Sequence, residues 1–497
     1  MTDGRHGLSP PSPRSLKTLD TDLGRIGLLE LGSRTVAQPL VALGIALAFM
    51  AIVGLTASAL TGGQPMSLAI VVAAVFGAYM ALNIGANDVA NNMGPAVGAR
   101  ALTLGGALVL AAVCETAGAL LAGGDVVGTV SRGIIAPESV ADNQTFIWAM
   151  LAALMAAALW INLATWLGAP VSTTHSVIGG VMGAGTAAAG FAAINWPVMS
   201  AIAASWVISP LMGGLLAAGF LAVINALIIQ VPDKRVAARR WVPVLIGVMA
   251  GTFAVYMAIK GVNRLVRIDL GPALLIGLAV GMLTTLAMRP VIRRQAVGME
   301  NRNRGLKKLF SVPLVFAAAL LSFAHGANDV ANAVGPLAAI VHAIEAGDGT
   351  DRVTIPLWVM MIGAVGLSVG LILFGPRLIR LVGSEITKLN AMRAWCVALA
   401  AAITVIIASW LGLPVSSTHI AIGGIFGVGF FREWYAERVL RKDRAANALP
   451  IEERARRKLV RRSHLLTIVA AWVITVPASA LVSGLLFLGL ALIPLAG

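Results

Sequence analysis

Long apolar runs recur along most of the chain and constrain its fold more than any other feature. Stretches such as 67–95, 197–230 and 310–340 hold about 20 or more mostly uncharged residues, the length with which a helix crosses the hydrocarbon core of a bilayer. Of the 497 residues 58% are apolar and 12% charged, against about 45–50% and about 25% in a soluble domain. These runs exclude a soluble enzyme and predict an all-α polytopic membrane protein with about 12 transmembrane helices.

Basic residues gather between the apolar runs. The chain has 37 Lys and Arg against 22 Asp and Glu, and many of the basic residues lie in 289–308 and 432–462. Such an excess would suggest a nucleic-acid partner in a soluble protein, but loops flanking membrane spans are basic when they face the cytoplasm. We therefore expect cytoplasmic loops in the inner (plasma) membrane and no nucleic-acid partner. Cys114 and Cys396 lie inside apolar runs without metal-ligand spacing, so packing is expected for both.

Two long motifs occur twice in the same order. Residues 85–95 read GANDVANNMGP and residues 326–336 read GANDVANAVGP; we call these the acidic motif. Residues 165–180 read TWLGAPVSTTHSVIGG and residues 409–424 read SWLGLPVSSTHIAIGG; we call their PVSTTH and PVSSTH cores the hydroxyl motif. The order and spacing indicate an internal duplication.

The charges predict that the two copies have opposite orientations. The amino-terminal stretch is basic and lacks a signal-peptide pattern, so the amino terminus is expected in the cytoplasm. The span 36–61 then carries the chain out before the first copy, whereas the basic loop 289–308 holds the start of the second copy inside. Inverted repeats with broken helices and half-helix hairpins are a recurrent architecture of secondary transporters, with the site near the membrane midplane.

This organisation divides the chain into seven predicted segments. They are a disordered cytoplasmic tail (1–35), an additional transmembrane helix (36–64), a first transport repeat (65–232), linking helices with a basic loop (233–308), a second repeat core (309–431), a basic cytoplasmic segment (432–463) and a final transmembrane helix (464–497).

Each copy of the acidic motif places one aspartate, Asp88 or Asp329, within an apolar run. A charged carboxylate at the bilayer centre costs about 2.5–3.5 kcal/mol, so such a residue indicates a functional site, with helix capping as the alternative. The following Gly-Pro pairs are expected to interrupt the helix and to free carbonyl oxygens. Oxygen ligands suit a small hard cation, so we predict a cation site at Asp88 and Asp329, with Na+ as one candidate. Glu115, a lone acid in another apolar run, is expected to contribute to coupling.

The hydroxyl motif is typical of the amino end of a half-helix within the membrane, with proline in the first helical position. Such an end presents free N–H groups and a partial positive charge, and neighbouring hydroxyls add donors for a tetrahedral oxyanion. The alternative is a proline-kinked helix whose hydroxyls bond to their own turn. The candidate anion ligands are Ser172, Thr173, Thr174, Ser416, Ser417 and Thr418.

Charge balance predicts that cations accompany the anion. Neither motif contains Lys or Arg, and two buried aspartates with a divalent oxyanion would bring about four negative charges into a low-dielectric site. This favours symport with Na+ or H+, or carriage of a neutral metal–anion complex, over passive conduction. His175, His325 and His419 are candidates for a proton relay, the alternative being hydrogen bonds between helices.

The paired motifs resemble the duplicated signature of the inorganic phosphate transporter (PiT) family of sodium- or proton-coupled phosphate symporters. The resemblance covers residues 65–497. It implies that Asn87 and Asn328 bind phosphate together with the six hydroxyls, and that Asn91 and Asn332 hold the coupling cation together with the two aspartates and Glu115, which matches a family glutamate. Ala398 stands where eukaryotic sodium-coupled members carry a second glutamate, and Ser417 replaces a threonine.

Together these features predict a secondary active symporter that moves inorganic phosphate by alternating access, and no enzyme activity. We expect no cofactor beyond the co-transported Na+ or H+. The expected partners are phosphate and membrane lipid, with a homodimer as an expected assembly. Symport of sulfate or of a metal–phosphate complex is an alternative because the family includes sulfate permeases. A channel-like anion conductance and a non-transporting phosphate sensor, which would use 432–462 for docking, are alternatives from other classes.

Overall fold

The computed structural model of the protein describes residues 40–62, 66–135, 137–167, 171–261, 268–299, 301, 303–345, 355–381, 390–440 and 462–493. Residues 50–497 form one compact unit, and the part before them belongs to a second. The expected amino-terminal tail and residues 441–461 of the basic segment lie outside the described residues.

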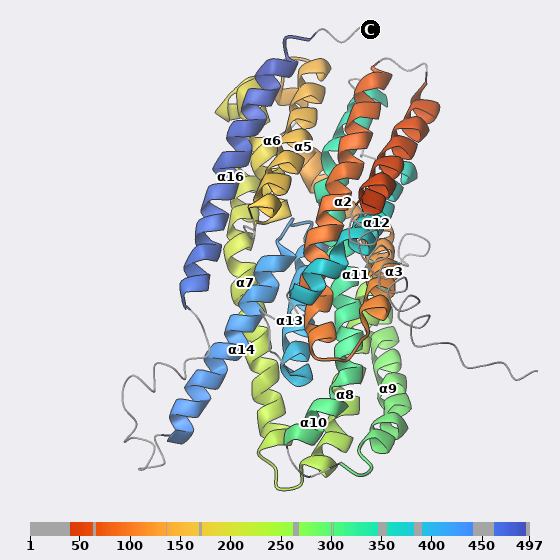
Figure 1. Ribbon diagram of the computed structural model, residues 1–497, viewed down its shortest axis with the longest axis vertical. Coiled ribbons are helices and arrows are strands. Elements are labelled where there is room, and N and C mark those ends of the chain that lie inside the picture. The colour runs from red at the N-terminus through yellow and green to blue at the C-terminus, as the bar shows by residue number, and fades with distance from the viewer. Residues whose placement is uncertain are drawn as a thin grey trace, which may run out of the picture. The chain divides into compact units, whose positions relative to one another are not determined.

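Helices make up almost all of the described part of the chain (Figure 1). Eleven of them are long and apolar enough to cross a membrane, which confirms the multi-pass all-α class. Besides the helix Leu40–Thr61, the elements are α2 (Ser67–Gly98), α3 (Leu104–Ala122), α4 (Gly124–Gly128), η1 (Thr129–Gly133), η2 (Pro137–Ser139), α5 (Asn143–Trp166), α6 (Thr173–Ala189), η3 (Phe191–Ala193), α7 (Trp196–Ile224), η4 (Asn225–Ile229), α8 (Lys234–Lys260), α9 (Leu270–Gln295), α10 (Asn303–Leu309), α11 (Ser311–Glu345), α12 (Leu357–Leu381), α13 (Ala391–Trp410), α14 (Ser417–Leu440) and α16 (Arg462–Leu490).

Polar residues ahead of the apolar runs set the starts of several helices. The side chain of Thr103 accepts a hydrogen bond from the first turn of α3, and Asp142 accepts one from the N–H of Thr145 at 2.7 Å in α5. Asn195 and Asn390 cap α7 and α13 in the same way. Capping satisfies N–H groups that a helix cannot bond internally, which matters most where water is scarce.

The helices that carry the acidic and hydroxyl motifs each pack on a helix of the other copy. In the first copy α2 packs on α12 of the second, and its counterpart α11 packs on α3 of the first. Likewise α6 packs on α16, and its counterpart α14 packs on α7 (Figure 1). The two copies are therefore interleaved along their length.

Glycines bring the backbones of these interleaved helices into contact. A Cβ atom at Gly85 of α2 would lie 2.0 Å from the carbonyl oxygen of Leu367 in α12. At the equivalent crossing, a Cβ atom at Gly326 of α11 would lie 2.1 Å from the carbonyl oxygen of Glu115 in α3. Close packing at small residues is the usual source of helix association in membranes. Leu367 thus occupies in the second copy the place that Glu115 occupies in the first.

The acidic motif does not interrupt its helices. Both α2 and α11 continue through the motif, with Pro95 and Pro336 inside them. The expectation of a broken helix there was wrong, because a membrane helix tolerates proline where neighbouring helices cover it. The motif therefore offers side-chain oxygens rather than freed backbone carbonyls.

The chain does break before the hydroxyl motif. In the first copy α5 ends at Trp166 and α6 begins at Thr173 with 17 residues, fewer than the about 20 needed to span a bilayer. In the second copy α13 ends at Trp410, and α14 begins at Ser417 and has 24 residues, so it is not shorter than a full span. We call α6 and α14 the half-helices because the start of each is buried inside the protein. Pro414 precedes the capping residue Ser416, so the expectation of proline in the first helical turn was wrong for this copy; Pro170 lies outside the described residues.

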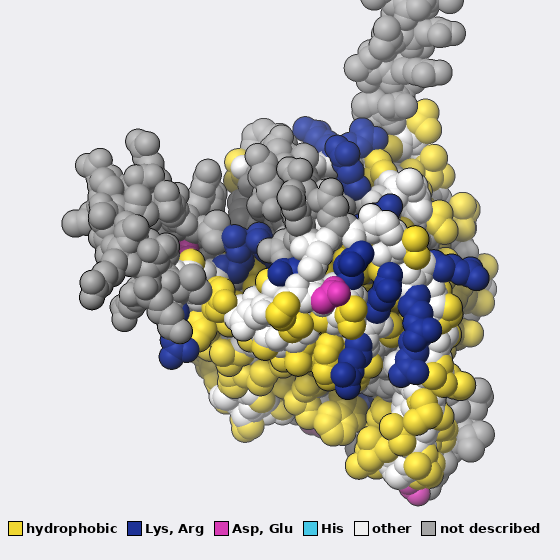
Figure 2. Space-filling model, turned by 90° about the horizontal axis from the view of Figure 1, so that it is seen from below, with side chains coloured by type: hydrophobic (Ala, Val, Ile, Leu, Met, Phe, Trp, Pro, Cys, Tyr) yellow, Lys and Arg dark blue, Asp and Glu magenta, His cyan; other side chains and the backbone are white. Residues whose placement is uncertain are grey.

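Basic side chains gather at the end of the molecule where α8 begins and α9 ends. α8 starts with Lys234 and Arg235, and the last turn of α9 carries Arg293 and Arg294. From this end Lys and Arg clearly outnumber Asp and Glu on the visible surface (Figure 2). The basic loop recognised in the sequence therefore contributes to one charged face.

Candidate functional site

The two copies of the acidic motif meet in the interior, where α2 and α11 pack together. One ligand atom each from Asp88, His325 and Asp329 lies within 4.8 Å of the others. The three residues are 4%, 0% and 1% exposed, respectively. Two aspartates far apart in the sequence thus share one buried cluster.

Hydroxyls from the half-helix ends donate to both aspartates. The Oγ1 of Thr173 lies 3.3 Å from Oδ2 of Asp88, and the Oγ of Ser417 lies 3.2 Å from Oδ2 of Asp329. Thr418 also donates to Oδ1 of Asp88, at 3.1 Å. Each aspartate therefore accepts from the first hydroxyl of the half-helix in its own copy.

The two asparagines that follow the aspartates bond across the copies. Asn91 donates to the hydroxyl of Thr418 at 2.8 Å, and Asn332 donates to the hydroxyl of Thr174 at 3.0 Å. This exchange joins α2 to α14 and α11 to α6. The motifs of both copies therefore build one site rather than two.

The first serine of each hydroxyl motif caps its half-helix. The N–H of His175 donates to Oγ of Ser172 at 3.2 Å, and the N–H of His419 donates to Oγ of Ser416 at 3.4 Å. Of the six candidate anion ligands, these two thus hold the helix ends, whereas the other four reach the aspartates or asparagines. Capped helix starts keep their partial positive charge, which favours an anion.

Asn87 and Asn328 hold the segments that lead into the half-helices. Asn328 donates to the hydroxyl of Ser409 at 3.0 Å and to the carbonyl oxygen of Leu413 at 3.1 Å, and accepts from the N–H of Val415 at 3.1 Å. Asn87 bonds to the hydroxyl of Thr165, the counterpart of Ser409, at 3.2 Å. Asn328 therefore positions the second hydroxyl motif, and Asn87 holds the end of the helix that precedes the first.

Replacing Asn328 by alanine is expected to lower the thermal stability of the purified protein more than the matched Asn87→Ala. Asn328 is 1% exposed, and its loss leaves the carbonyl of Leu413 and the N–H of Val415 without this partner, at about 1–3 kcal/mol for each buried group. Asn87 is half-buried and bonds to one side chain. Thermal unfolding in detergent, followed by tryptophan fluorescence, measures the difference; equal stability of the two variants would contradict the positioning role.

Glu115 reaches the cluster through His325. Nδ1 of His325 lies 3.1 Å from Oε1 of Glu115, and Nε2 lies 3.0 Å from Oδ2 of Asp329 and 3.8 Å from Oδ2 of Asp88. Asn92 donates to Oε1 of Glu115 at 3.0 Å. Asn92 was not among the residues predicted from the sequence, although a second consecutive asparagine in an apolar run is a signal of a polar contact.

The three candidate relay histidines fall into two groups. His325 lies among the carboxylates, whereas the rings of His175 and His419 have their centroids 4.7 Å apart. His175 also packs against Trp206 at 4.0 Å, and the indole N–H of Trp206 donates to the carbonyl oxygen of Pro414 at 3.2 Å. His175 and His419 thus lie where the two half-helices begin.

The cluster is rich in oxygen acceptors and poor in positive charge. Within the described residues, Oδ1 of Asp329, Oδ1 of Asn332 and Oε2 of Glu115 are buried and accept no hydrogen bond. In the same part of the chain, the ion pairs of Asp88, Glu115 and Asp329 are all with His325. Carboxylate, amide and hydroxyl oxygens are the ligands that small hard cations prefer. The site can therefore hold cations beside an anion bound at the half-helix ends.

Comparison with known proteins gives consistent matches. Residues 84–483 match the model of the phosphate transporter family. The chain is 45% identical to a protein of Helicobacter pylori named "Putative phosphate permease", over 90% of this chain and 95% of that one. It is 34% identical to the chloroplastic inorganic phosphate transporter 2-1 of Arabidopsis thaliana, over 82% and 69% of the two chains.

A solved structure, described as the sodium-dependent phosphate transporter, superimposes with a TM-score of 0.77. The two proteins are 33% identical, and the match covers 86% of this chain and 100% of the other. With the family model covering most of its length, the chain belongs to the phosphate transporter family.

Proposed function

We propose that the protein is a secondary active symporter that brings inorganic phosphate across the cytoplasmic membrane together with Na+. The observation that carries this proposal is the cluster in which hydroxyls of both half-helices donate to Asp88 and Asp329. Sodium is favoured over protons because the cluster offers many oxygen ligands, and because a transporter that is 33% identical is described as sodium-dependent.

In this proposal the site hydroxyls couple the two substrates. A hydroxyl has one hydrogen to donate, and those of Thr173, Ser417 and Thr418 donate to the aspartates. When phosphate binds at the half-helix ends, these hydrogens turn to its oxygens, and the aspartates lose their donors. Cations then replace the donors at Asp88 and Asp329, assisted by Asn91 and Asn332. Phosphate binding and cation binding each favour the other.

His325 and Glu115 keep the cluster ordered between transport steps. The imidazole bridges Glu115 and Asp329 and approaches Asp88, so it links acids from both copies. A proton-coupled mechanism is the second candidate because the same bridge would conduct a proton between the acids. The symport experiment below distinguishes the two.

Alternating access is proposed to arise from rocking of two inverted repeats, 65–232 and 309–431 with 464–497, around this site. The exchanged packing of α2 on α12 and of α11 on α3 supports two equivalent halves. The basic face where α8 begins and α9 ends supports a cytoplasmic location for the loop 289–308. The remaining segments link or anchor these halves.

Radiolabelled phosphate uptake into proteoliposomes tests the proposal. We expect accumulation with an inward Na+ gradient at equal pH, and none with an inward proton gradient in the absence of Na+. Excess sulfate should leave uptake unchanged, and so should a chelator of divalent metals. Accumulation driven by protons alone would overturn the sodium assignment. Competition by sulfate would indicate a sulfate transporter, and loss of uptake with the chelator would indicate transport of a metal–phosphate complex. Downhill flux alone would indicate an anion conductance, and phosphate binding without flux would indicate a sensor.

A further inference from the structure

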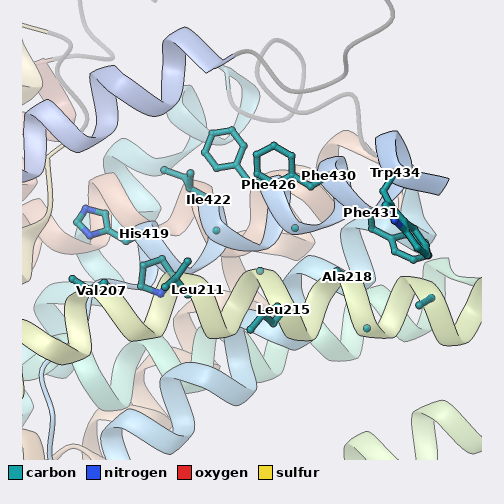
Figure 3. A pocket seen from close by; sticks show the side chains of 16 residues that line it. Val207, Leu211, Leu215, Ala218, His419, Ile422, Phe426, Phe430, Phe431 and Trp434 are labelled. Carbon is teal, nitrogen blue, oxygen red and sulfur yellow. The ribbon is translucent and has the colours of Figure 1, made fainter. Parts of the chain in front are cut away.

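An apolar groove runs between α7 and α14. It encloses about 830 Å³. Val207, Leu211 and Leu215 of α7 line one side, and Ile422, Phe426 and Phe430 of α14 line the other (Figure 3). The lining is thus aliphatic and aromatic over most of its length.

The groove faces outward rather than toward the phosphate site. Leu211 and Leu215 are 63% and 71% exposed, and Phe430 is 44% exposed. In a membrane protein such side chains meet acyl chains instead of water. The chemistry of the lining therefore fits a hydrocarbon chain.

The floor of the groove is close-packed backbone. A Cβ atom at Gly427 of α14 would lie 2.0 Å from the carbonyl oxygen of Gly214 in α7. Farther along α7, a Cβ atom at Gly219, which also lines the groove, would meet no atom within 4 Å. The helices thus touch at the floor and leave open space above it.

The groove is long enough to hold an acyl chain of one membrane leaflet. His419 and Val207 lie at one end, and Phe431 and Trp434 lie at the other (Figure 3). The α14 backbone rises about 22 Å between His419 and Trp434, and one leaflet contributes about 15 Å of hydrocarbon. Because His419 lies in the first turn of a half-helix, the groove leads from the middle of the protein toward the membrane surface.

The outer end is aromatic and carries the exposed Arg438, with Arg432, Glu433 and Glu437 nearby on the same helix. The guanidinium of Arg438 lies 4.7 Å from the ring centroid of Trp434. Tyr435 stacks on Phe431 and accepts a hydrogen bond from Gln230 at 2.8 Å. Trp and Tyr are enriched at the level of lipid headgroups, and Arg is well suited to phosphate. We propose that the groove binds one anionic phospholipid, with an acyl chain along α7 and α14 and its headgroup phosphate at Arg438.

This site goes beyond the proposed function, since lipid binding requires no transport. Native mass spectrometry of the full chain in detergent, with phosphatidylglycerol or phosphatidylcholine added, measures it directly. We expect wild-type protein to bind one phosphatidylglycerol about fivefold more tightly than phosphatidylcholine, the effect of about one basic residue at an anionic headgroup. Arg438→Gln should abolish this preference, whereas Arg377→Gln, at an exposed arginine of α12, should keep it.

A second pair of variants tests the groove itself. Gly219→Leu should fill the open space and reduce retention of either lipid at this site, whereas Gly105→Leu, at an equally open glycine of α3, should not. As an independent readout, phosphatidylglycerol with brominated acyl chains should quench less fluorescence in Trp434→Phe than in wild type. Unchanged lipid preference in Arg438→Gln, or unchanged retention in Gly219→Leu, would overturn the proposal.

Discussion

Asp88→Asn and Asp329→Asn are each expected to lower sodium-driven phosphate uptake at least about a hundredfold while the protein still inserts. Asparagine keeps the size of the side chain but removes the negative charge that would hold a cation. Breaking a buried charge pair costs about 3–5 kcal/mol, and each 1.4 kcal/mol changes an equilibrium tenfold. The amide would also present a donor to Thr173 or Ser417, which now donate to the carboxylates.

Asp269→Asn is the matched control for these two variants. Asp269 is exposed before α9 and makes no capping hydrogen bond, so its charge lies outside the cluster. Initial rates of radiolabelled phosphate uptake are compared at equal protein content, and gel filtration in detergent verifies folding. Wild-type uptake by either Asp88→Asn or Asp329→Asn would refute the cation role of that aspartate. Loss of uptake in Asp269→Asn would show that removing any carboxylate lowers uptake, and the two test variants would then not support a cation site.

Gly326→Ala is expected to prevent stable assembly of α3 with α11. The added methyl would lie 2.1 Å from the carbonyl oxygen of Glu115, and backbone on both sides leaves no flexible side chain to move aside. Overpacking typically costs about 1–3 kcal/mol, and contact with backbone belongs to the costlier cases. The helices must separate, which also pulls Glu115 away from His325, now 3.1 Å apart.

The yield and thermal stability of the purified protein measure this effect. Gly105→Ala provides the control, because a Cβ atom there meets nothing within 4 Å and alanine favours the helix. We expect Gly326→Ala to show little monodisperse protein and Gly105→Ala to match or exceed wild type. A Gly326→Ala protein with wild-type stability would mean that the crossing of α3 and α11 is looser than described.

Some features of the site were predictable because their signals are local. The cost of a carboxylate in hydrocarbon singles out Asp88, Asp329 and Glu115 in any apolar run. The hydrogen bonds between the two copies of the motifs could not be predicted from the sequence. Asn91 and Thr418 are 327 residues apart, and Asn332 and Thr174 are 158 apart, so which hydroxyl each asparagine meets depends on how the copies interleave.

The sequence by itself determined the class of protein and its duplication. In a bilayer nearly every backbone polar group must be satisfied within a helix or a closed barrel, so long apolar runs allow few other structures. The tertiary structure decided that α2 and α11 run unbroken through Pro95 and Pro336, since packing by neighbours makes proline tolerable there. It also decided that Asn87 and Asn328 hold the segments before the half-helices. Hydrogen bonds between distant segments follow from helix packing, and no local sequence pattern encodes them.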